Sequence, residues 1–267
     1  MGRWFALIGP LEPILEVRGV SKYFGSLKAL DGVDLVVPRG KVTLLIGPNG
    51  SGKTTLINVI TGVLRPDGGR IVFEGIDITD MGAHERFRLG IVRTFQIPRL
   101  FQNLSILENT VVGRHGNPGE SLVRGLIRSL WYGFERRSHE DALDHLDRLN
   151  LREQLGSAGD RRPRELSGGQ MKLLEISRAL MPYKPKLIIM DEPVAGVNPT
   201  LAHEILSFVK KVSVSEGVTF LIVEHRLDIA VEYADYAYAM HLGRVIAHGD
   251  PRSVLEDPRV IESYLGG

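Results

Sequence analysis

One stretch of the sequence reads Gly47-Pro48-Asn49-Gly50-Ser51-Gly52-Lys53-Thr54. It follows an apolar run at Val42–Ile46, which is typical of a strand buried on both faces of a parallel sheet. A helical pattern at residues 54–61 follows it. The spacing G-x-x-x-x-G-K-[ST] between a strand and a helix predicts a loop that binds phosphates. An accidental match in a chain of this length has odds of about one in a hundred.

Each residue type in this loop suits contact with a nucleoside triphosphate. Glycines let successive backbone N–H groups face the phosphates, and the start of the following helix adds a partial positive charge. We expect Lys53 to reach the β- and γ-phosphates and Thr54 to offer its hydroxyl to Mg²⁺. The alternative, a glycine-rich turn with an exposed lysine, is disfavoured by the flanking strand and helix. The predicted nucleotide contacts are Gly47, Pro48, Asn49, Gly50, Ser51, Gly52, Lys53, Thr54 and Thr55.

Strand and helix patterns alternate on both sides of the loop. A buried strand at 187–190, an amphipathic helix at 200–214 and a buried strand at 218–223 predict an α/β core with a parallel sheet. Further β-rich runs lie at 14–20, 34–37 and 70–73.

The character of the chain changes between Leu104 and Pro163, where leucines recur at helical spacing. We interpret this region as a helical insertion and its leucines as core residues. Ser138 with Asp141 resembles a capping box at the start of the second helix. The residues that carry the pattern are Leu122, Leu126, Leu130, Ala142, Leu143, Leu146 and Leu149.

The composition excludes several classes of function. A net charge of +1 gives no basic surplus for a nucleic-acid partner, and the chain has no cysteine for a disulfide, a thiolate catalyst or a thiolate metal site. No apolar run approaches the length of about 20 residues that crosses a bilayer, and residues 1–12 lack the marks of a signal peptide. We expect residues 1–12 to be a tail and any membrane role to need a partner.

Two acids end the strand at 187–190. Ligands bind at the carboxyl ends of strands in open α/β sheets, so Asp191 is placed to hold Mg²⁺, directly or through its water. Glu192 is placed to orient or deprotonate the attacking water. His225 follows the second buried strand and could donate to the γ-phosphate. Without the phosphate loop, each of these residues would be read as an ordinary polar strand end.

The stretch Leu166-Ser167-Gly168-Gly169-Gln170 resembles the LSGGQ signature of ATP-binding-cassette (ABC) ATPases. The serine hydroxyl and the backbone N–H groups of a helix start form another anion site. The resemblance runs from about Ile14 to Leu265. It implies a P-loop NTPase fold of the RecA-like type with a mixed sheet core, an antiparallel β subdomain and a helical subdomain inserted at about 97–180 of an ABC ATPase domain at 13–267.

In this family the signature of one subunit closes over the phosphates held by another, so the resemblance implies a head-to-tail dimer with a second ABC ATPase subunit, identical or not. Ser167, Gly168, Gly169 and Gln170 would then contact ATP in trans. The resemblance also implies that Phe24 stacks on adenine, with Tyr23 as an alternative, and that Gln96 touches Mg²⁺ or the water and senses a membrane partner.

Finer features resemble the ATPase subunits of branched-chain amino-acid uptake systems. They are Arg93-Thr94-Phe95-Gln96 with Arg99-Leu100-Phe101, the helical insertion, and Asp191-Glu192-Pro193-Val194-Ala195-Gly196-Val197-Asn198-Pro199. Asn198 replaces the aspartate of many ABC ATPases and is usual in this subgroup. Subunits for urea, short amides or lipopolysaccharide export look similar, so the cargo stays open at this point.

The resemblance implies transmembrane permease subunits as partners, received by a groove around residues 98–108, and indirectly a solute-binding protein. It places the subunit at the cytoplasmic face of the membrane as a peripheral protein. A soluble ABC ATPase of the chromosome or ribosome type is disfavoured, since residues 96–166 hold no sustained heptads and the chain has one phosphate loop. A binding module without turnover is disfavoured because Glu192, Gln96 and His225 are all present.

Overall fold

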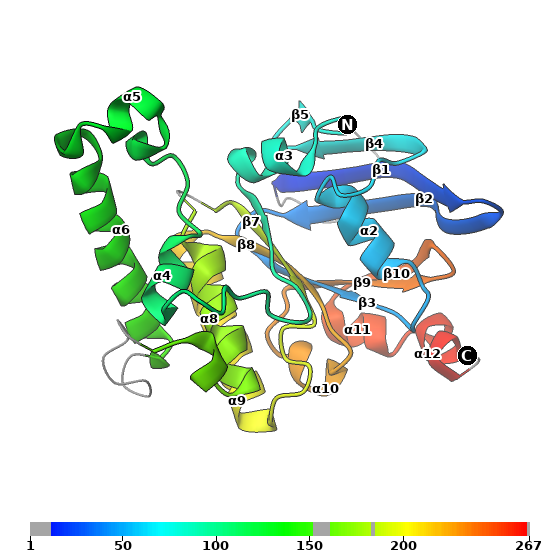
Figure 1. Cartoon of the computed structure of the whole chain (residues 1–267). Helices are drawn as coiled ribbons and strands as arrows, with labels where there is room; N and C mark the ends of the chain where they lie inside the picture. Colours follow the sequence, from blue (N-terminus) through cyan, green and yellow to red (C-terminus); the bar gives the residue numbers. More distant parts are fainter. Residues whose placement is uncertain (1–11, 152–160, 183–184, 266–267) are drawn as a thin grey trace. The chain divides into compact units, whose positions relative to one another are not determined.

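The computed structural model describes residues 12–151, 161–182 and 185–265, arranged as two compact units (Figure 1). Unit 1 comprises residues up to Gln96 together with 186–195 and 199–267, and unit 2 comprises 97–185 with 196–198. Of the tail expected at residues 1–12, only Glu12 lies within the described residues.

A six-stranded sheet forms the centre of unit 1, in the order β10-β9-β3-β8-β7-β6. Its strands run parallel except for β10, which pairs antiparallel with β9. Every residue of β3, β7 and β8 is buried, which matches their nearly unbroken apolar sequences. The strand bounds are β3 (Val42–Ile46), β6 (Ile91–Arg93), β7 (Leu187–Asp191), β8 (Thr219–Val223), β9 (Tyr236–His241) and β10 (Arg244–Gly249).

A second sheet of unit 1 has four antiparallel strands in the order β2-β1-β4-β5. They are β1 (Pro13–Phe24), β2 (Leu27–Pro38), β4 (Gly68–Phe73) and β5 (Ile76–Asp77). A buried apolar cluster joins side chains of both sheets to one face of α2 (Lys53–Ile60). The helix that follows the phosphate loop is therefore anchored in the core of unit 1.

Arg86 fixes the far end of α2. Its buried guanidinium donates to the carbonyl oxygens of Val59 and Ile60 and to those of Met81 and Thr79. These bonds satisfy carbonyls that a helix end leaves without partners. Arg86 belongs to α3 (Ala83–Leu89). The other helices described in unit 1 are α9 (Pro199–Glu216), α10 (Leu227–Ala230), α11 (Pro251–Leu255) and α12 (Pro258–Leu265).

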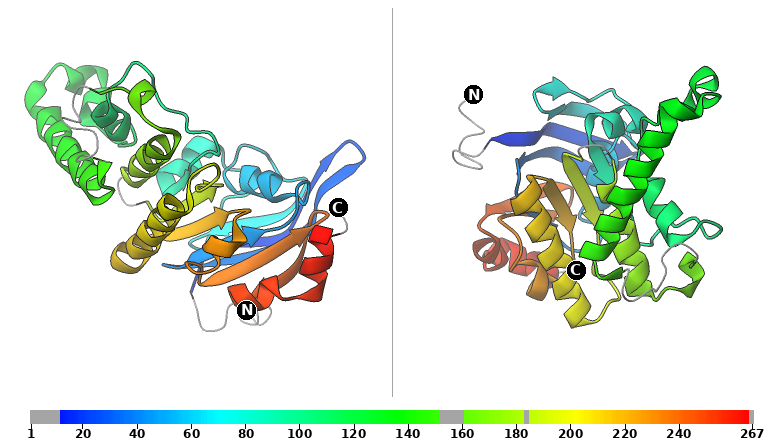
Figure 2. Two further views of the ribbon diagram at one scale, coloured as in Figure 1. Left: turned by 90° about the horizontal axis from the view of Figure 1, so that it is seen from below. Right: turned by 90° about the vertical axis from the view of Figure 1, so that its left-hand side faces the viewer.

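The elements that the structure describes in unit 2 are helices. The longest, α6 (Arg128–Arg148), is one continuous helix in Figure 1 and in both views of Figure 2. The expectation that a helix begins at Ser138 is therefore wrong: the Ser138 hydroxyl donates to the carbonyl of Phe134 inside the helix instead of capping a terminus. The other elements described are α4 (Ile106–Val111), η1 (Pro118–Glu120), α5 (Leu122–Gly125), η2 (Pro163–Glu165) and α8 (Gly168–Leu180).

The leucines of the insertion divide into two groups. Ala142, Leu146 and Leu149 are buried, as expected. Leu122 and Leu126, by contrast, are 93% and 88% exposed, and Leu130 is also exposed, so their interpretation as core residues is wrong. The physical reason is that α5 ends at Gly125, so the helical spacing runs across two separate helices and does not trace one buried face.

No helix among the residues that the structure describes has both the length and the apolar character needed to cross a membrane.

Candidate functional site

The loop between β3 and α2 needs glycine for steric reasons. Gly47 has φ +148°, and a Cβ there would lie 2.2 Å from the carbonyl oxygen of Met240. Gly52, the residue before α2, has φ +102°, and its Cβ would lie 2.5 Å from the carbonyl oxygen of Ala29. These contacts exclude a side chain at both ends of the loop and hold its backbone against neighbouring strands.

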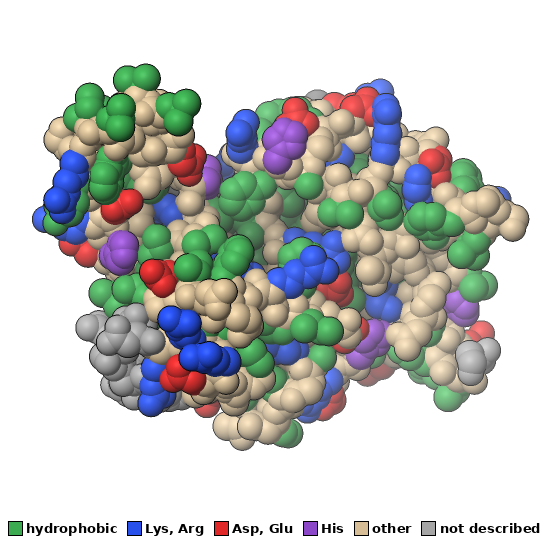
Figure 3. Space-filling model, viewed as in Figure 1, with side chains coloured by type: hydrophobic (Ala, Val, Ile, Leu, Met, Phe, Trp, Pro, Cys, Tyr) green, Lys and Arg blue, Asp and Glu red, His purple; other side chains and the backbone are tan. Residues whose placement is uncertain are grey.

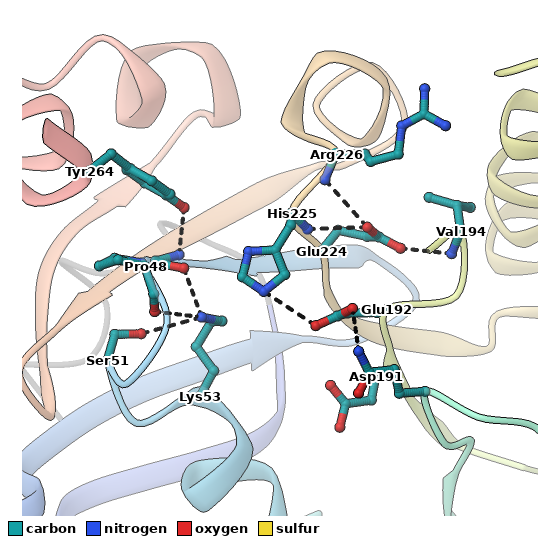
Figure 4. Close-up of polar contacts among 12 residues, drawn as sticks. Pro48, Ser51, Lys53, Asp191, Glu192, Val194, Glu224, His225, Arg226 and Tyr264 are labelled. Carbon is teal, nitrogen blue, oxygen red and sulfur yellow. Dashed lines mark hydrogen bonds and ion pairs between the residues drawn. The ribbon is translucent and has the colours of Figure 1, made fainter. Parts of the chain in front are cut away.

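The Lys53 side chain bends back onto this loop (Figure 4). Its Nζ donates to the carbonyl oxygens of Gly47 at 2.7 Å and Pro48 at 2.9 Å, and it lies 3.4 Å from the Ser51 hydroxyl. Burial lowers the pKa of Lys53, while the negative charges of Glu192 and Asp191 act in the opposite direction. The ammonium is thus held among neutral oxygens, close to the place where phosphates would lie.

Tyr264 contacts the same loop from the C-terminal helix α12. The Gly47 N–H donates to its hydroxyl oxygen at 2.8 Å (Figure 4). Burial raises the pKa of Tyr264, so this hydroxyl stays protonated at neutral pH. This contact could not be predicted from the sequence, because the two partners lie 217 positions apart and no local pattern links them.

Asp191 ends β7 and is paired with an arginine from the neighbouring strand. Nη2 of Arg93 lies 3.0 Å from Oδ2 of Asp191, and both side chains are largely buried. Arg93 also donates to the side-chain oxygen of Asn58 on α2. The strand β6 and the helix after the loop therefore both position the carboxylate of Asp191.

Glu192 meets the two other residues expected to act in catalysis. Gln96 Nε2 donates to its Oε2 at 2.7 Å, and His225 Nε2 lies 3.3 Å from its Oε1 (Figure 4). Glu192 has φ +50°, which is uncommon for a residue with a side chain and is frequent at functional sites. The three side chains come from positions just after β6, β7 and β8, so the parallel sheet brings them together.

Glu224 supports this arrangement and was missed as a functional residue. Its side chain is buried and accepts hydrogen bonds from the backbone N–H groups of Val194, His225 and Arg226. It fixes the chain that follows β8 to the chain that follows β7, and so sets where His225 and Glu192 lie. The sequence signal that could have identified Glu224 is its position between an apolar strand and a histidine.

The loop and the acids line one cavity of about 360 Å³, a size suited to a small-molecule ligand. Phe24 lines it and is half exposed, whereas Tyr23 is not among the lining residues. The predicted residues that line the cavity are Phe24, Asn49, Gly50, Ser51, Gly52, Lys53, Thr54, Thr55, Asp191, Glu192 and His225. The lining residues that were not predicted are Leu27, Lys28, Ala29, Val223 and Leu242.

The signature residues lie in unit 2, at the start of α8. Ser167 caps this helix: its hydroxyl accepts from the Gln170 N–H at 3.3 Å, and the Gln170 side chain accepts from the Ser167 N–H at 2.9 Å. Gly168 and Gly169 form the first turn; Ser167 and Gly168 are exposed to solvent, and Gly169 is partly buried. This helix start presents backbone donors that can meet an anion.

The acids of the site are too few to hold a metal ion by themselves. Across the described parts of the chain, no group of three or more His, Cys, Asp and Glu side chains could do so. The side chains of Thr54, Asp191 and Gln96 offer oxygen ligands of the kind that Mg²⁺ binds, with nucleotide phosphates and water as its remaining ligands.

Comparison with known proteins agrees with this geometry. Residues 30–195 match the model of the family described as ABC transporter, and residues 244–267 match that of the branched-chain amino acid ATP-binding cassette transporter family. A relative in Methanocaldococcus jannaschii, named probable branched-chain amino acid transport ATP-binding protein LivG, is 50% identical over 257 residues. That match covers 95% of this chain and 97% of the relative.

Solved structures of similar chains point the same way. The ADP conformation of an ATP-binding cassette of an ABC transporter is similar with a TM-score of 0.82 and 49% identity, over 96% of this chain and all of the other. A dimeric cassette in a post-hydrolysis state with ADP and Pi has a TM-score of 0.72 at 25% identity, over 89% and 99% of the two chains.

These matches confirm the resemblance and the fold class inferred from the sequence: a mixed sheet, an antiparallel β sheet and a helical insertion around one phosphate loop. They also confirm ATP as the nucleotide that the chain binds. The chain belongs to the ABC transporter family as its ATP-binding subunit, an ATPase that drives transport.

Proposed function

We propose that this chain is the ATP-hydrolysing subunit of an importer of branched-chain amino acids. The observation that carries the proposal is the cavity in which the phosphate loop, Asp191, Glu192 and His225 converge. The cargo is supported by the name of the Methanocaldococcus jannaschii relative and by the match of residues 244–267. Urea, short amides and lipopolysaccharide export are the alternatives that a transport assay must separate.

Binding of ATP would use groups that already face the cavity. Lys53 moves its ammonium from the carbonyls of Gly47 and Pro48 to the β- and γ-phosphates, and the backbone N–H groups of residues 49–55 surround the phosphate chain. Phe24 offers its ring to the adenine, an interaction that its half-exposed position permits.

Thr54, Asp191 and Gln96 would hold Mg²⁺ through hydroxyl, carboxylate and amide oxygens. When bound, the cation neutralises charge on the β- and γ-phosphate oxygens. Arg93 keeps the Asp191 carboxylate in place through its ion pair, and Gln96 must exchange its present contact with Glu192 for a contact at the metal or the water.

Hydrolysis would depend on Glu192 and His225. A Glu192 oxygen accepts the proton of the attacking water while the water oxygen bonds to the γ-phosphorus and the bond to the β-phosphate oxygen breaks. His225, fixed by the backbone contact to Glu224, donates a hydrogen bond to the γ-phosphate. The products are ADP and phosphate.

A second cassette subunit would complete the site with its own Ser167, Gly168, Gly169 and Gln170. Two copies placed head to tail use the exposed helix start of each chain over the nucleotide of the other. ATP binding then joins the subunits, and loss of phosphate separates them. Permease subunits at the cytoplasmic face of the membrane would convert this cycle into transport, with cargo delivered by a solute-binding protein.

The direct test of the enzyme is Glu192→Gln. We expect ATP binding to persist, because the phosphate loop is untouched, and steady-state hydrolysis to fall by about 10²–10⁴-fold, the usual contribution of a general base. Light scattering with Mg-ATP should then show a stable dimer. The matched control is Glu204→Gln, an exposed acid on α9. Unchanged hydrolysis in Glu192→Gln would remove this residue from catalysis.

The cargo is tested in proteoliposomes that contain the chain together with the permease subunits that co-purify with it and the cognate solute-binding protein. ATP-dependent uptake of labelled leucine or isoleucine is the expected result. Uptake of urea or an amide alone would assign the same ATPase to another solute, and failure of all three solutes with retained ATPase activity would reject the amino-acid assignment.

A further inference from the structure

The exposed leucines of unit 2 belong to a larger apolar surface, which we call the apolar tip. It lies on α5 and the start of α6, where Figure 3 shows hydrophobic side chains gathered at the place that α5 occupies in Figure 1. All of its members are exposed large hydrophobic residues: Leu122, Val123, Leu126, Ile127, Leu130 and Tyr132. Contiguous apolar surface of this kind marks a binding site more often than chance.

Internal contacts hold the apolar tip in shape. The Trp131 indole N–H donates to the carbonyl of Gly125 at 2.9 Å, and the Gly125 N–H donates to the carbonyl of Ser121 at 2.7 Å. The first bond joins α5 to α6, and the two bonds together satisfy polar groups of the turn within the tip. The leucines are therefore presented outward by an ordered structure.

The charge of the apolar tip has one sign. Between Ser121 and Phe134 the only charged side chains are Arg124 and Arg128, both exposed, and the nearest acids in sequence are Glu120 and Glu135. Neither arginine forms an ion pair with a residue that the structure describes, and Arg128 lies over the Tyr132 ring at 4.9 Å.

We propose that the apolar tip docks onto the surface of an anionic lipid bilayer. Aliphatic side chains enter the boundary between headgroups and acyl chains, Trp and Tyr suit the same boundary, and arginines pair with lipid phosphates. Two cations and no acid lie within the apolar tip, and this charge complements the phosphates of anionic lipids, which favours a lipid surface over a partner protein. Membrane contact would thus not depend on the permease alone.

This docking goes beyond the ATPase cycle and requires no nucleotide. Its test is co-sedimentation of the full chain with vesicles of phosphatidylcholine alone or with 30% phosphatidylglycerol. We expect binding to the anionic vesicles, weakened but not abolished by 0.5 M salt. Binding to neutral vesicles should be about 25-fold less, because each of the two arginines contributes about a fivefold preference near an anionic surface. ATPase activity measured in solution reports separately on the enzyme.

Two variants separate the apolar and the ionic contributions. Leu122→Ser with Leu126→Ser should lower the partition coefficient at least tenfold on anionic vesicles, since two aliphatic side chains no longer enter the lipid. Arg124→Gln with Arg128→Gln should remove the preference for anionic vesicles. Val214→Ser and Lys211→Gln, exposed on α9, are the matched controls and should bind as the unaltered chain does.

Equal vesicle binding by the leucine variant and the unaltered chain would overturn the lipid assignment. Absence of vesicle binding by the unaltered chain would overturn it as well. If the leucine variant then also loses co-purification with permease subunits, the apolar tip is a protein interface. Retained ATPase activity and circular dichroism in the variants exclude unfolding as the cause of lost binding.

Discussion

At the scale of single residues, the phosphate loop is shaped by what its glycines touch. Gly47 combines a positive φ with a backbone neighbour, and the neighbour is the carbonyl of Met240 on β9. A strand cannot move this oxygen without breaking its pairing with β3 or β10. A side chain at Gly47 must therefore displace the loop.

We expect Gly47→Ala to lower stability by about 2–4 kcal/mol through backbone strain and steric overlap, and to weaken ATP binding because the loop shifts. Thermal unfolding and nucleotide titration measure the two effects. Gly133→Ala is the control: this glycine lies inside α6 with nothing near its Cβ position, so alanine should stabilise by about 0.5–1 kcal/mol. Equal midpoints for Gly47→Ala and the unaltered chain would contradict the steric argument.

Residues with chemistry inside a local motif could be predicted from the sequence, and residues placed by distant chain segments could not. Lys53 was predicted from the spacing of the phosphate loop, and Asp191 and Glu192 from their place after a buried strand; the structure places all three at one cavity. Tyr264 and Glu224 act by accepting backbone hydrogen bonds, which tertiary folding alone creates. The roles of the site residues stay predictions until the variants are measured.

At the scale of elements, the spacing of apolar residues identified helices but did not show which of their side chains are covered by other elements. Leu146 and Leu122 occupy equivalent positions in their patterns, yet one is buried and the other is exposed. Periodicity reports which side chains share a face, whereas burial depends on a neighbouring element that the pattern does not contain. Ser138 fails as a cap for a similar reason, since nothing before it in sequence breaks the helix.

The role of helix α12 in supporting the phosphate loop can be tested by removing a single oxygen atom. Tyr264→Phe removes the hydroxyl that accepts from the Gly47 N–H and leaves the ring in place. We expect a loss of about 0.5–1.5 kcal/mol in stability and a weaker hold on the loop, seen as faster ATP dissociation.

The control for Tyr264→Phe is Tyr132→Phe, which removes the hydroxyl of a half-exposed tyrosine in unit 2. Its unfolding midpoint and ATP dissociation rate should stay unchanged. If Tyr264→Phe behaves like this control in both measurements, the C-terminal helix does not support the loop.

At the scale of the whole molecule, alternation of buried strands and helices predicted the α/β sheet, and the family resemblance supplied the antiparallel sheet and the insertion. The order β10-β9-β3-β8-β7-β6 places strands distant in sequence side by side. The last two strands, at 236–241 and 244–249, were not predicted, although they pair with each other across the turn Leu242-Gly243. The position of β9 beside β3, by contrast, depends on contacts across the fold that no local pattern contains.

A dimer in which the phosphate loop of one chain faces the signature of the other makes a prediction that a dimer without this arrangement does not. Lys53→Ala lacks a phosphate donor, and removing one preorganised donor costs about 2.7–4 kcal/mol of transition-state stabilisation. Ser167→Arg obstructs the signature. Each variant alone should be inactive, but a mixture should regain up to about a quarter of the unaltered ATPase activity, because half of the pairs are mixed and each mixed pair contains one intact site.

The controls for this mixture are each variant mixed with itself at the same total concentration. Both should remain at the background rate. A mixture that stays at that rate, while cross-linking shows mixed pairs, would mean that loop and signature of the same chain serve one nucleotide.

The resting place of the Lys53 ammonium has a consequence for nucleotide capture. The amine rests on uncharged carbonyl dipoles and forms no salt bridge with either acid of the cavity. An arriving polyphosphate therefore displaces uncharged partners and gains a full ionic attraction, so loading requires no prior rupture of an internal ion pair.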